Sequence, residues 1–346
     1  MVVSVESYSD HLIQKLIEVF EKLNGSRILI TGVSGFVGKC MLQASRDVQL
    51  ATFDQVEIVA LTRNIQAPHV QSAIQIGCPN VSWIEGNFLE ERLDVGKVDM
   101  IIHAATPASA TLNVENPNEM LRVNITAMKS VLRLVGDNTP FLFTSSGAVY
   151  GTQPESITHI PERGVYPNPQ MDHLSAYAQG KQAAERMCRE SGDEGRCNPI
   201  IARLFAFGGE YLPRDTHFAI GNFVQNALDR KPIVIKGDGR ARRSYLYGGD
   251  MATWLWCALA SGGNEGPFHI GSENSISVLE LAQNVAKVSG DVLNFVPEIV
   301  VSIPVDGSLP AHQYVPSTVL TRRVLNVEEW TSLDEIIARM IKQGAS

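Results

Sequence analysis

Residues 28–38 read Ile-Leu-Ile-Thr-Gly-Val-Ser-Gly-Phe-Val-Gly. The apolar start predicts a buried strand, Gly32, Gly35 and Gly38 predict a tight turn, and a helical pattern begins near Phe36. Glycine suits such a turn because the backbone takes unusual angles and must approach a pyrophosphate, which then binds free N–H groups at the helix N-terminus. The strand before the turn and the helix after it favour a dinucleotide site over a purely structural glycine turn.

The overall composition is typical of a globular protein with a small ligand. The 346 residues are 44% hydrophobic and 19% charged, so the chain can bury a large core without disulfides or metals. A formal net charge of −8 and a pI near 5.5 argue against nucleic acid or an anionic membrane as partner. The five cysteines form no CxxC or Cys/His cluster, which indicates reduced thiols and neither zinc nor a disulfide framework. With no membrane-spanning apolar run and no signal pattern, we expect a cytoplasmic protein.

Strand-like and helix-like segments alternate over the first two-thirds of the chain. The strand-like runs after the glycine turn are 56–61, 81–84, 100–103, 141–144 and 200–204. This alternation predicts an α/β fold with a Rossmann-type doubly wound parallel sheet. Past Phe205 the texture changes to Gly, Pro and aromatic residues, which predicts a smaller C-terminal substrate-binding lobe.

The predicted organisation has three parts. Residues 1–25 carry an amphipathic helix that starts at Ser9 or Asp10 and stops at Gly25, and we expect it to pack on the main domain rather than to form an oligomer contact. The NAD(P)-binding Rossmann domain is expected over 26–204, with 244–262 returning to it, and the substrate lobe over 205–243 and 263–346.

The end of the second strand usually selects the dinucleotide, because an acid there binds the adenosine ribose hydroxyls whereas a basic residue accepts the NADP phosphate. The strand 56–61 is followed by Thr62, Arg63 and Asn64, so we favour NADP(H). NAD remains possible, since Asp54 would select it if the strand were 48–53 instead. The branched apolar run after Asp54 is the better strand.

Tyr177 and Lys181 are four residues apart, on one face of a predicted helix. A tyrosine has an ordinary pKa of about 10 and is a poor base near neutral pH unless a neighbouring cation stabilises its phenolate. Lys181 can supply that cation. A half-exposed tyrosine beside a solvated lysine would have the same spacing, so the prediction depends on its context.

That context is the segment 144–151, Thr-Ser-Ser-Gly-Ala-Val-Tyr-Gly, directly after a predicted strand. Hydroxyls at the carboxyl end of a parallel strand lie where such sheets bind ligands. With the glycine turn, these features resemble the extended short-chain dehydrogenase/reductase family of nucleotide-sugar epimerases, dehydratases and reductases. The shared motifs are TGxxGFxG at 31–38, an NVxxT-like segment at 124–126, SSxxVYG at 145–151, YxxxK at 177–181, an Arg-Leu-Phe segment at 203–205, and GDGxxxR at 237–243 before a Tyr-Leu-Tyr-Gly-Gly-Asp run that ends at Asp250.

The resemblance implies a role for each matching residue. Tyr177 would be the acid/base catalyst, and Lys181 would lower its pKa while holding the nicotinamide ribose. Ser146 would hydrogen-bond the reacting sugar oxygen. Arg243 would clamp the nucleotide diphosphate with a bidentate guanidinium, and Asn222 would hydrogen-bond the same diphosphate.

The resemblance also implies further cofactor contacts beyond the three glycines. They are Ser34, Phe36 and Val37 in the turn, Arg63 after the second strand, Asn87 after the third, Ala104 and Ala105 after the fourth, Asn124 and Lys181. Asn87 stands where the family has an aspartate on the adenine, and an amide can still hydrogen-bond that base.

Two positions depart from the family pattern. Members that eliminate water between sugar carbons 4 and 6 usually carry an Asp-Glu pair just after the catalytic Ser/Thr, and decarboxylases of uronic-acid nucleotides commonly have a Glu near the second of these positions. Here the two residues are Gly147 and Ala148. Asp172 and His173 are candidate substitutes from elsewhere in the chain.

The sequence therefore predicts an NAD(P)-dependent enzyme that modifies a nucleotide-diphosphate hexose at C4, as a 4-keto reductase or a 4-epimerase. A nucleotide-sugar 4,6-dehydratase is the alternative among enzymes. A non-catalytic dinucleotide sensor or structural subunit is the alternative of another class, and such relatives commonly lose the tyrosine or the lysine. The resemblance further implies a homodimer through a four-helix contact that includes the Tyr177 helix.

Overall fold

The computed structural model describes residues 8–52, 55–87, 93–106, 110–163, 174–215, 218–262, 266–305 and 311–345. Within these residues a parallel sheet forms the centre of the molecule, in the order β11-β6-β5-β4-β1-β2-β3. Its strands are β1 (Arg27–Thr31), β2 (Glu57–Thr62), β3 (Val81–Glu85), β4 (Met100–His103), β5 (Thr139–Ser146), β6 (Cys197–Leu204) and β11 (Phe268–Ile270). The order reverses between β1 and β4, as in a doubly wound sheet, so the predicted Rossmann-type fold is confirmed.

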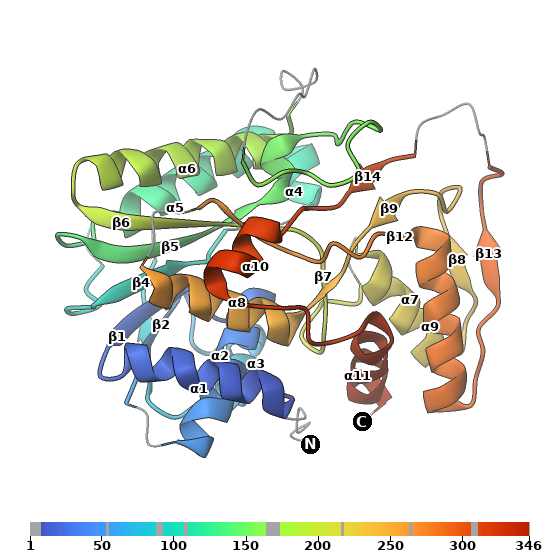
Figure 1. Cartoon of the computed structure of the whole chain (residues 1–346), viewed down its shortest axis with the longest axis horizontal. Helices are drawn as coiled ribbons and strands as arrows, with labels where there is room; N and C mark the ends of the chain where they lie inside the picture. The colour runs from blue at the N-terminus through green and yellow to red at the C-terminus, as the bar shows by residue number, and fades with distance from the viewer. Residues whose placement is uncertain are drawn as a thin grey trace.

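Helices cover both faces of this sheet (Figure 1). Alternate residues of β1 point to opposite faces: Leu29 packs in a core beneath α5 (Pro117–Val131) and α6 (Ala176–Asp193). Ile28 and Ile30 join the larger core under α2 (Phe36–Ala51) and α8 (Gly248–Ser261). Both faces are apolar because both are buried, which explains the continuous hydrophobic runs of the strands.

The N-terminal helix α1 (Asp10–Leu23) lies against the α8 side of the domain. Its apolar stripe, including Leu12, Leu16 and Phe20, is fully buried, and the Phe20 ring packs edge-on to Trp256 at 5.0 Å between centroids. The helix therefore uses its hydrophobic face within the chain.

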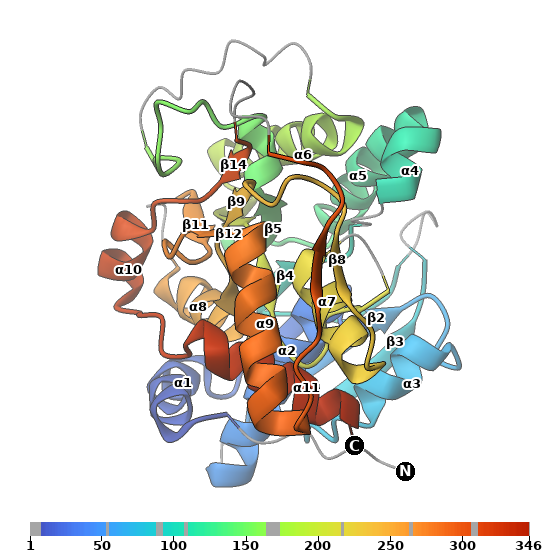
Figure 2. The ribbon, with the colours of Figure 1, turned by 90° about the vertical axis from the view of Figure 1, so that its right-hand side faces the viewer.

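The second half of the chain builds a lobe beside the sheet, which faces the viewer in Figure 2. Its helices are α7 (Ala219–Leu228), α9 (Val278–Leu293) and α11 (Leu333–Ala345), and its short strands are β8 (Ile233–Ile235), β9 (Arg242–Arg243), β12 (Ile276–Ser277), β13 (Ile299–Val301) and β14 (Gln313–Tyr314). Strands β7 (Phe207–Gly208) and β10 (Leu246–Tyr247) pair with each other at the junction. The remaining elements are α3 (Pro68–Ile74), α4 (Ala110–Glu115), the 3-10 turn η1 (Gly147–Tyr150) and α10 (Val319–Leu325).

One strand of the predicted lobe belongs to the central sheet instead. The prediction assigned all of 263–346 to the lobe, but β11 pairs with β6 and extends the central sheet. Phe268 and Ile270 are fully buried in the main core, so this short apolar strand is more stable in the large sheet than in the lobe.

Candidate active site

The glycine turn has the geometry that a dinucleotide requires. Gly32 has φ +72°, and a Cβ there would lie 2.5 Å from the Ala104 carbonyl oxygen and 2.7 Å from the Ala105 nitrogen. A Cβ at Gly38 would lie 2.4 Å from the backbone of Val33, so this glycine lets α2 approach β1. The N-cap of α2 is the exposed Gly35, without a side-chain cap, and the first N–H groups of the helix are thus open to an anion. These residues fit a pyrophosphate, with Ser34, Phe36 and Val37 half-buried around the same turn.

The predicted second strand is confirmed, because β2 ends at Thr62 and Arg63 follows it with an exposed side chain. The alternative strand over 48–53 is wrong, since residues 48–51 belong to α2. Asp54 lies outside the described residues. Asn87 is half-buried just past β3.

Lys181 is buried at the carboxyl ends of the central strands. Its side chain is in the chain's interior, 2% exposed, and Nζ donates to the Thr144 carbonyl at 2.6 Å and to the Thr106 hydroxyl at 2.5 Å. Burial lowers the pKa of Lys181 to about 7, against a smaller raising effect of Glu185. The ammonium therefore titrates near neutral pH and keeps a third donor position for a ligand.

Tyr177 lies near this lysine at the start of α6, and its pKa is affected by Ser146. Ser175 caps α6 by accepting from the Ala178 N–H, and the Tyr177 N–H donates to Asn113 at 2.9 Å, which fixes the first turn. Burial raises the pKa of Tyr177, and a hydrogen-bonding interaction with the Ser146 hydroxyl lowers it. The opposing effect thus comes from Ser146 rather than from Lys181, whose Nζ lies 5.8 Å from the Tyr177 ring centroid.

Taken together, a glycine-lined anion site and a Ser-Tyr-Lys cluster lie at the same end of one parallel sheet. A family model described as "NAD dependent epimerase/dehydratase family" matches residues 28–271, which includes both features. The chain belongs to the NAD-dependent epimerase/dehydratase family. It is therefore an enzyme that uses a nicotinamide dinucleotide.

Curated members of this family resemble most of the chain. UDP-glucuronic acid decarboxylase 1 of Arabidopsis thaliana is 28% identical over 320 residues, which cover 91% of this chain and 69% of that protein. UDP-glucuronic acid decarboxylase 4 of the same organism is 30% identical over 263 residues, covering 75% of this chain and 56% of that protein.

Solved structures of family members share the fold. UDP-glucuronic acid 4-epimerase from Bacillus cereus, in complex with UDP-glucuronic acid and NAD, has a TM-score of 0.72 at 21% identity and covers 92% of this chain and 99% of that chain. UDP-N-acetylglucosamine 4-epimerase from Methanobrevibacter ruminantium has a TM-score of 0.75 at 18% identity, covering 92% of this chain and 98% of that chain.

The two residues expected to bind substrate lie in different parts of the lobe. Arg243 is half-buried in β9, where Nη1 donates to the Arg242 carbonyl at 2.7 Å, and its guanidinium lies 5.9 Å from the Tyr314 ring centroid. Asn222 is half-buried in α7 and shares no hydrogen bond or ion pair with the Ser-Tyr-Lys cluster in the described part of the chain. Arg243 is thus next to Tyr314, the residue whose hydroxyl lies against Gly147. The roles of Arg243 and Asn222 in substrate binding stay predictions.

Asn124 lies in α5 where it packs against α6. Its side chain is fully buried and donates to the Met120 carbonyl at 2.9 Å, and its Cβ lies 3.0 Å from the position of a Cβ built on Gly180, one residue before Lys181. The structure shows Asn124 packed between α5 and α6. Its contact with the cofactor stays a prediction.

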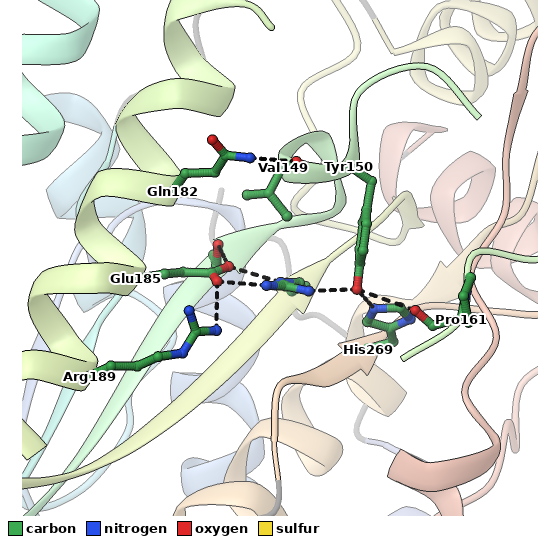
Figure 3. Close-up of polar contacts among 9 residues, drawn as sticks. Val149, Tyr150, Pro161, Gln182, Glu185, Arg189 and His269 are labelled. Atoms are coloured by element: carbon green, nitrogen blue, oxygen red, sulfur yellow. Dashed lines mark hydrogen bonds and ion pairs between the residues drawn. The ribbon is translucent and has the colours of Figure 1, made fainter. Parts of the chain in front are cut away.

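A polar network joins α6 to the end of the central sheet, next to the residues that carry the cluster (Figure 3). Glu185, one turn after Lys181, accepts from Arg203 at 2.7 and 2.9 Å and from the Ser145 hydroxyl at 2.6 Å. Arg203 also donates to the Tyr150 hydroxyl at 2.6 Å, and that hydroxyl lies 2.7 Å from His269 Nε2. The network ties the segment that carries Ser146 to the helix that carries Tyr177, so both are held in one position.

Sequence reasoning missed Thr106 and Tyr314 as parts of the site. Thr106 lies three residues after the end of the predicted strand 100–103, so its place beside Lys181 was open to inference from topology. Tyr314 lies far along the chain in a short strand, and no sequence signal marks it. Asp172 and His173 lie outside the described residues.

No metal site is formed by the described residues, in which no group of three or more His, Cys, Asp and Glu side chains is arranged to hold an ion. No helix in the described ranges is long and apolar enough to cross a membrane.

Proposed function

We propose that the protein carries out oxidation or reduction at C4 of a nucleotide-activated hexose, as a 4-keto reductase or a 4-epimerase. The observation that carries the proposal is the convergence of Ser146, Tyr177 and Lys181 beside the glycine turn, with no carboxylate at positions 147 and 148. A hydride and one proton are the groups that such a site can move.

The residues divide this chemistry between them. The bound nicotinamide supplies the hydride acceptor or donor for C4. Burial keeps the Tyr177 phenol protonated near neutral pH, and a protonated phenol can give its proton to a C4 oxygen during reduction. Ser146 hydrogen-bonds the same oxygen, and the third donor position of Lys181 would hold the nicotinamide ribose.

The surroundings of Gly147 argue against 4,6-dehydration by the usual route. A Cβ at this position would lie 2.5 Å from both the Phe205 ring and the Tyr314 hydroxyl. An acidic side chain there would need both neighbours to move, and Ala148 carries no acid. We therefore prefer hydride and proton transfer at C4 alone.

Three finer assignments belong to this proposal. Arg63 at the end of β2 favours NADP(H) over NAD, and a net reductase fits NADP(H) better than an epimerase that recycles its cofactor. The relatives and structural neighbours named above act on or bind UDP-sugars, so uridine is the base we favour. A cytoplasmic homodimer that uses the α6 face completes the proposal.

Decarboxylation of UDP-glucuronic acid is a second candidate, because the resemblance to UDP-glucuronic acid decarboxylases covers 91% of the chain. Oxidation of a uronic acid at C4 gives a β-keto acid. Its C5–C6 bond can break with loss of carbon dioxide, the electron pair of that bond forms an enolate with the C4 carbonyl, and a proton adds at C5. The hydride removed from C4 would then return to that carbon and reduce the ketone to a pentose. Ala148 stands where such decarboxylases commonly have a glutamate, so this route would have to proceed without that side chain.

The test is a cofactor titration followed by a substrate panel. Purified protein is titrated with NADPH and NADH, then mixed with UDP-4-keto-6-deoxyhexoses, UDP-glucose, UDP-N-acetylglucosamine and UDP-glucuronic acid, and cofactor oxidation and products are followed. Stoichiometric loss of NADPH indicates a reductase, interconversion of 4-epimers without net loss indicates an epimerase, and a UDP-pentose indicates the second candidate.

Tyr177→Phe is the matched control, because it removes one hydroxyl from the cluster. We expect it to abolish turnover while the cofactor still binds. A 4-keto-6-deoxy product from UDP-glucose would overturn the proposal in favour of a dehydratase. Cofactor binding without turnover in either protein would favour the sensor class.

A further inference from the structure

A second phenol lies at the reacting centre, in the place of a side chain that residue 147 lacks. The Tyr314 hydroxyl is 2.5 Å from the position of a Cβ built on Gly147, and the Tyr314 ring packs on Phe205 at 5.0 Å between centroids. Gly147 is the residue directly after Ser146. The Tyr314 hydroxyl therefore lies against the residue that follows the serine expected to hydrogen-bond the substrate.

The position of Tyr314 is fixed by strand pairing. In β14 it pairs with Arg243 of β9, and the next residue, Val315, is bonded on both sides: its N–H donates to Gln153 at 2.9 Å and its carbonyl accepts from Ile160 at 2.8 Å. These bonds hold the segment against the loop that follows η1. The backbone around Tyr314 is thus fixed by hydrogen bonds on both sides.

The Ser146 hydroxyl affects two phenols. It lowers the pKa of both Tyr177 and Tyr314 by hydrogen bonding, against the larger raising effect of burial. Its Oγ accepts from the Ala148 N–H at 3.1 Å. Burial raises the pKa of Tyr314, with smaller raising effects of Tyr177 and Tyr150 and a lowering effect of Arg243. Tyr314 consequently stays a protonated donor over the working pH range.

A serine hydroxyl has one proton to donate and two positions at which it accepts. The Ala148 N–H uses one acceptor position. If Tyr314 donates to the other, the Ser146 proton can only be donated, and the groups that remain to receive it are Tyr177 and the sugar oxygen between them.

We propose that Tyr314 is a positioning residue that fixes the Ser146 hydroxyl as a donor toward the sugar C4 oxygen and the Tyr177 phenol. This inference rests on the proposed C4 chemistry. Negative charge develops on the C4 oxygen of the sugar in the transition state. A serine hydroxyl already held as a donor stabilises this charge without having to reorient. The interactions tighten when the sugar oxygen enters the cluster.

Tyr314→Phe tests the inference, because it removes the hydroxyl and keeps the ring on Phe205. We expect kcat to fall about tenfold to a hundredfold, less than the roughly hundredfold to thousandfold that loss of a direct donor typically costs, because Ser146 itself remains. KM and cofactor affinity should change less than about threefold. Tyr211→Phe is the control: it removes another buried phenolic hydroxyl, one without a hydrogen-bond partner among the described residues. Melting temperatures of both variants report on folding.

Two further readouts separate positioning from a structural role. Ser146→Ala should lower kcat at least as much, and the double variant should be no slower than Ser146→Ala alone, because Tyr314 acts through Ser146. In the oxidative direction Tyr177 must be deprotonated, and Ser146 as a donor stabilises that phenolate. The acidic limb of the pH profile should therefore move to higher pH in Tyr314→Phe.

The outcomes are distinct. If Tyr177→Phe abolishes turnover but Tyr314→Phe is as active as wild type, or if the effects of Tyr314→Phe and Ser146→Ala multiply, the inference is wrong and the proposed function stands. If Tyr177→Phe turns over every nucleotide sugar as wild type does, the proposed function is wrong and the inference falls with it.

Discussion

Arg203 of β6 and Glu185 of α6 meet in a two-point ion pair, with Nη2 2.7 Å from Oε2 and Nε 2.9 Å from Oε1. The Glu185 side chain is 3% exposed and that of Arg203 is 14% exposed. The pair joins the helix of Tyr177 and Lys181 to the sheet, one turn from the lysine. Its loss should affect both stability and catalysis.

Glu185→Gln should destabilise the protein by about 3 kcal/mol, because it leaves the Arg203 guanidinium buried without its counter-charge. Urea denaturation at pH 7 measures this. The control is Glu194→Gln, which removes an exposed partner of Arg196 and should change the free energy of unfolding by less than about 0.5 kcal/mol. Equal effects of the two variants would show that the buried pair contributes nothing special.

The same variant should show a pH dependence of known sign. Hydrogen bonding and the charges of Arg203 and Arg189 outweigh burial and hold the pKa of Glu185 below its ordinary value of 4.5. Its stabilisation is complete above that value and is lost as pH falls through the lowered pKa. The stability difference between wild type and Glu185→Gln should be constant from pH 6 to 8 and shrink below about pH 4.

Lys181→Met should lose less stability at neutral than at alkaline pH. Burial lowers the pKa of Lys181 from 10.5 to about 7, so between these values the unfolded chain binds one proton more than the native protein. Wild-type stability relative to the variant should therefore rise between pH 7 and 9.5, by about 1–3 kcal/mol. Lys22→Met, at an exposed position of α1, should show no such trend. A flat difference for Lys181→Met would contradict the burial argument.

Gly38→Ala should weaken cofactor binding at least tenfold and cost about 2 kcal/mol of stability, because its Cβ would lie 2.4 Å from Val33 and push α2 away from β1. Fluorescence titration and thermal melting check both effects. Gly136→Ala is a matched control, since the nearest atom to its Cβ is 3.6 Å away, and should bind the cofactor as wild type does.

Arg63→Ala should raise the dissociation constant of NADPH by about 10-fold to 100-fold through loss of a charge-assisted bond to the ribose phosphate, and should leave NADH binding unchanged. Arg133→Ala removes another exposed arginine, after α5, and should affect neither cofactor. Equal weakening of both cofactors by Arg63→Ala would refute the preference for NADP(H).

The parts of the fold that follow local rules could be predicted from sequence. The strand 56–61 lies within one residue of β2 because branched apolar residues and a polar end mark a buried strand. The glycine turn was recognisable because Gly32 and Gly38 meet steric limits that only glycine satisfies. Motifs single out Ser146, Tyr177 and Lys181, which lie at one end of the sheet, and their catalytic roles stay predictions.

The parts that depend on distant pairing could not be predicted. Tyr314 reaches Ser146 only because β14 pairs with β9, and two-residue strands leave no periodic pattern. The contact of His269 with Tyr150 depends in the same way on β11 joining β6. The effect of Ser146 rather than Lys181 on the Tyr177 pKa depends on distances that a four-residue spacing does not fix.

The crowding around Gly147 restricts the order in which this enzyme's lineage can change its chemistry. A side chain at residue 147 has no room until both Phe205 and Tyr314 have moved or been replaced, and Tyr314 is carried by a strand of the other lobe. Replacing Gly147 alone should therefore disrupt the packing of the site without introducing a usable acid. Laboratory evolution toward elimination chemistry would need libraries that vary residues 147, 205 and 314 together.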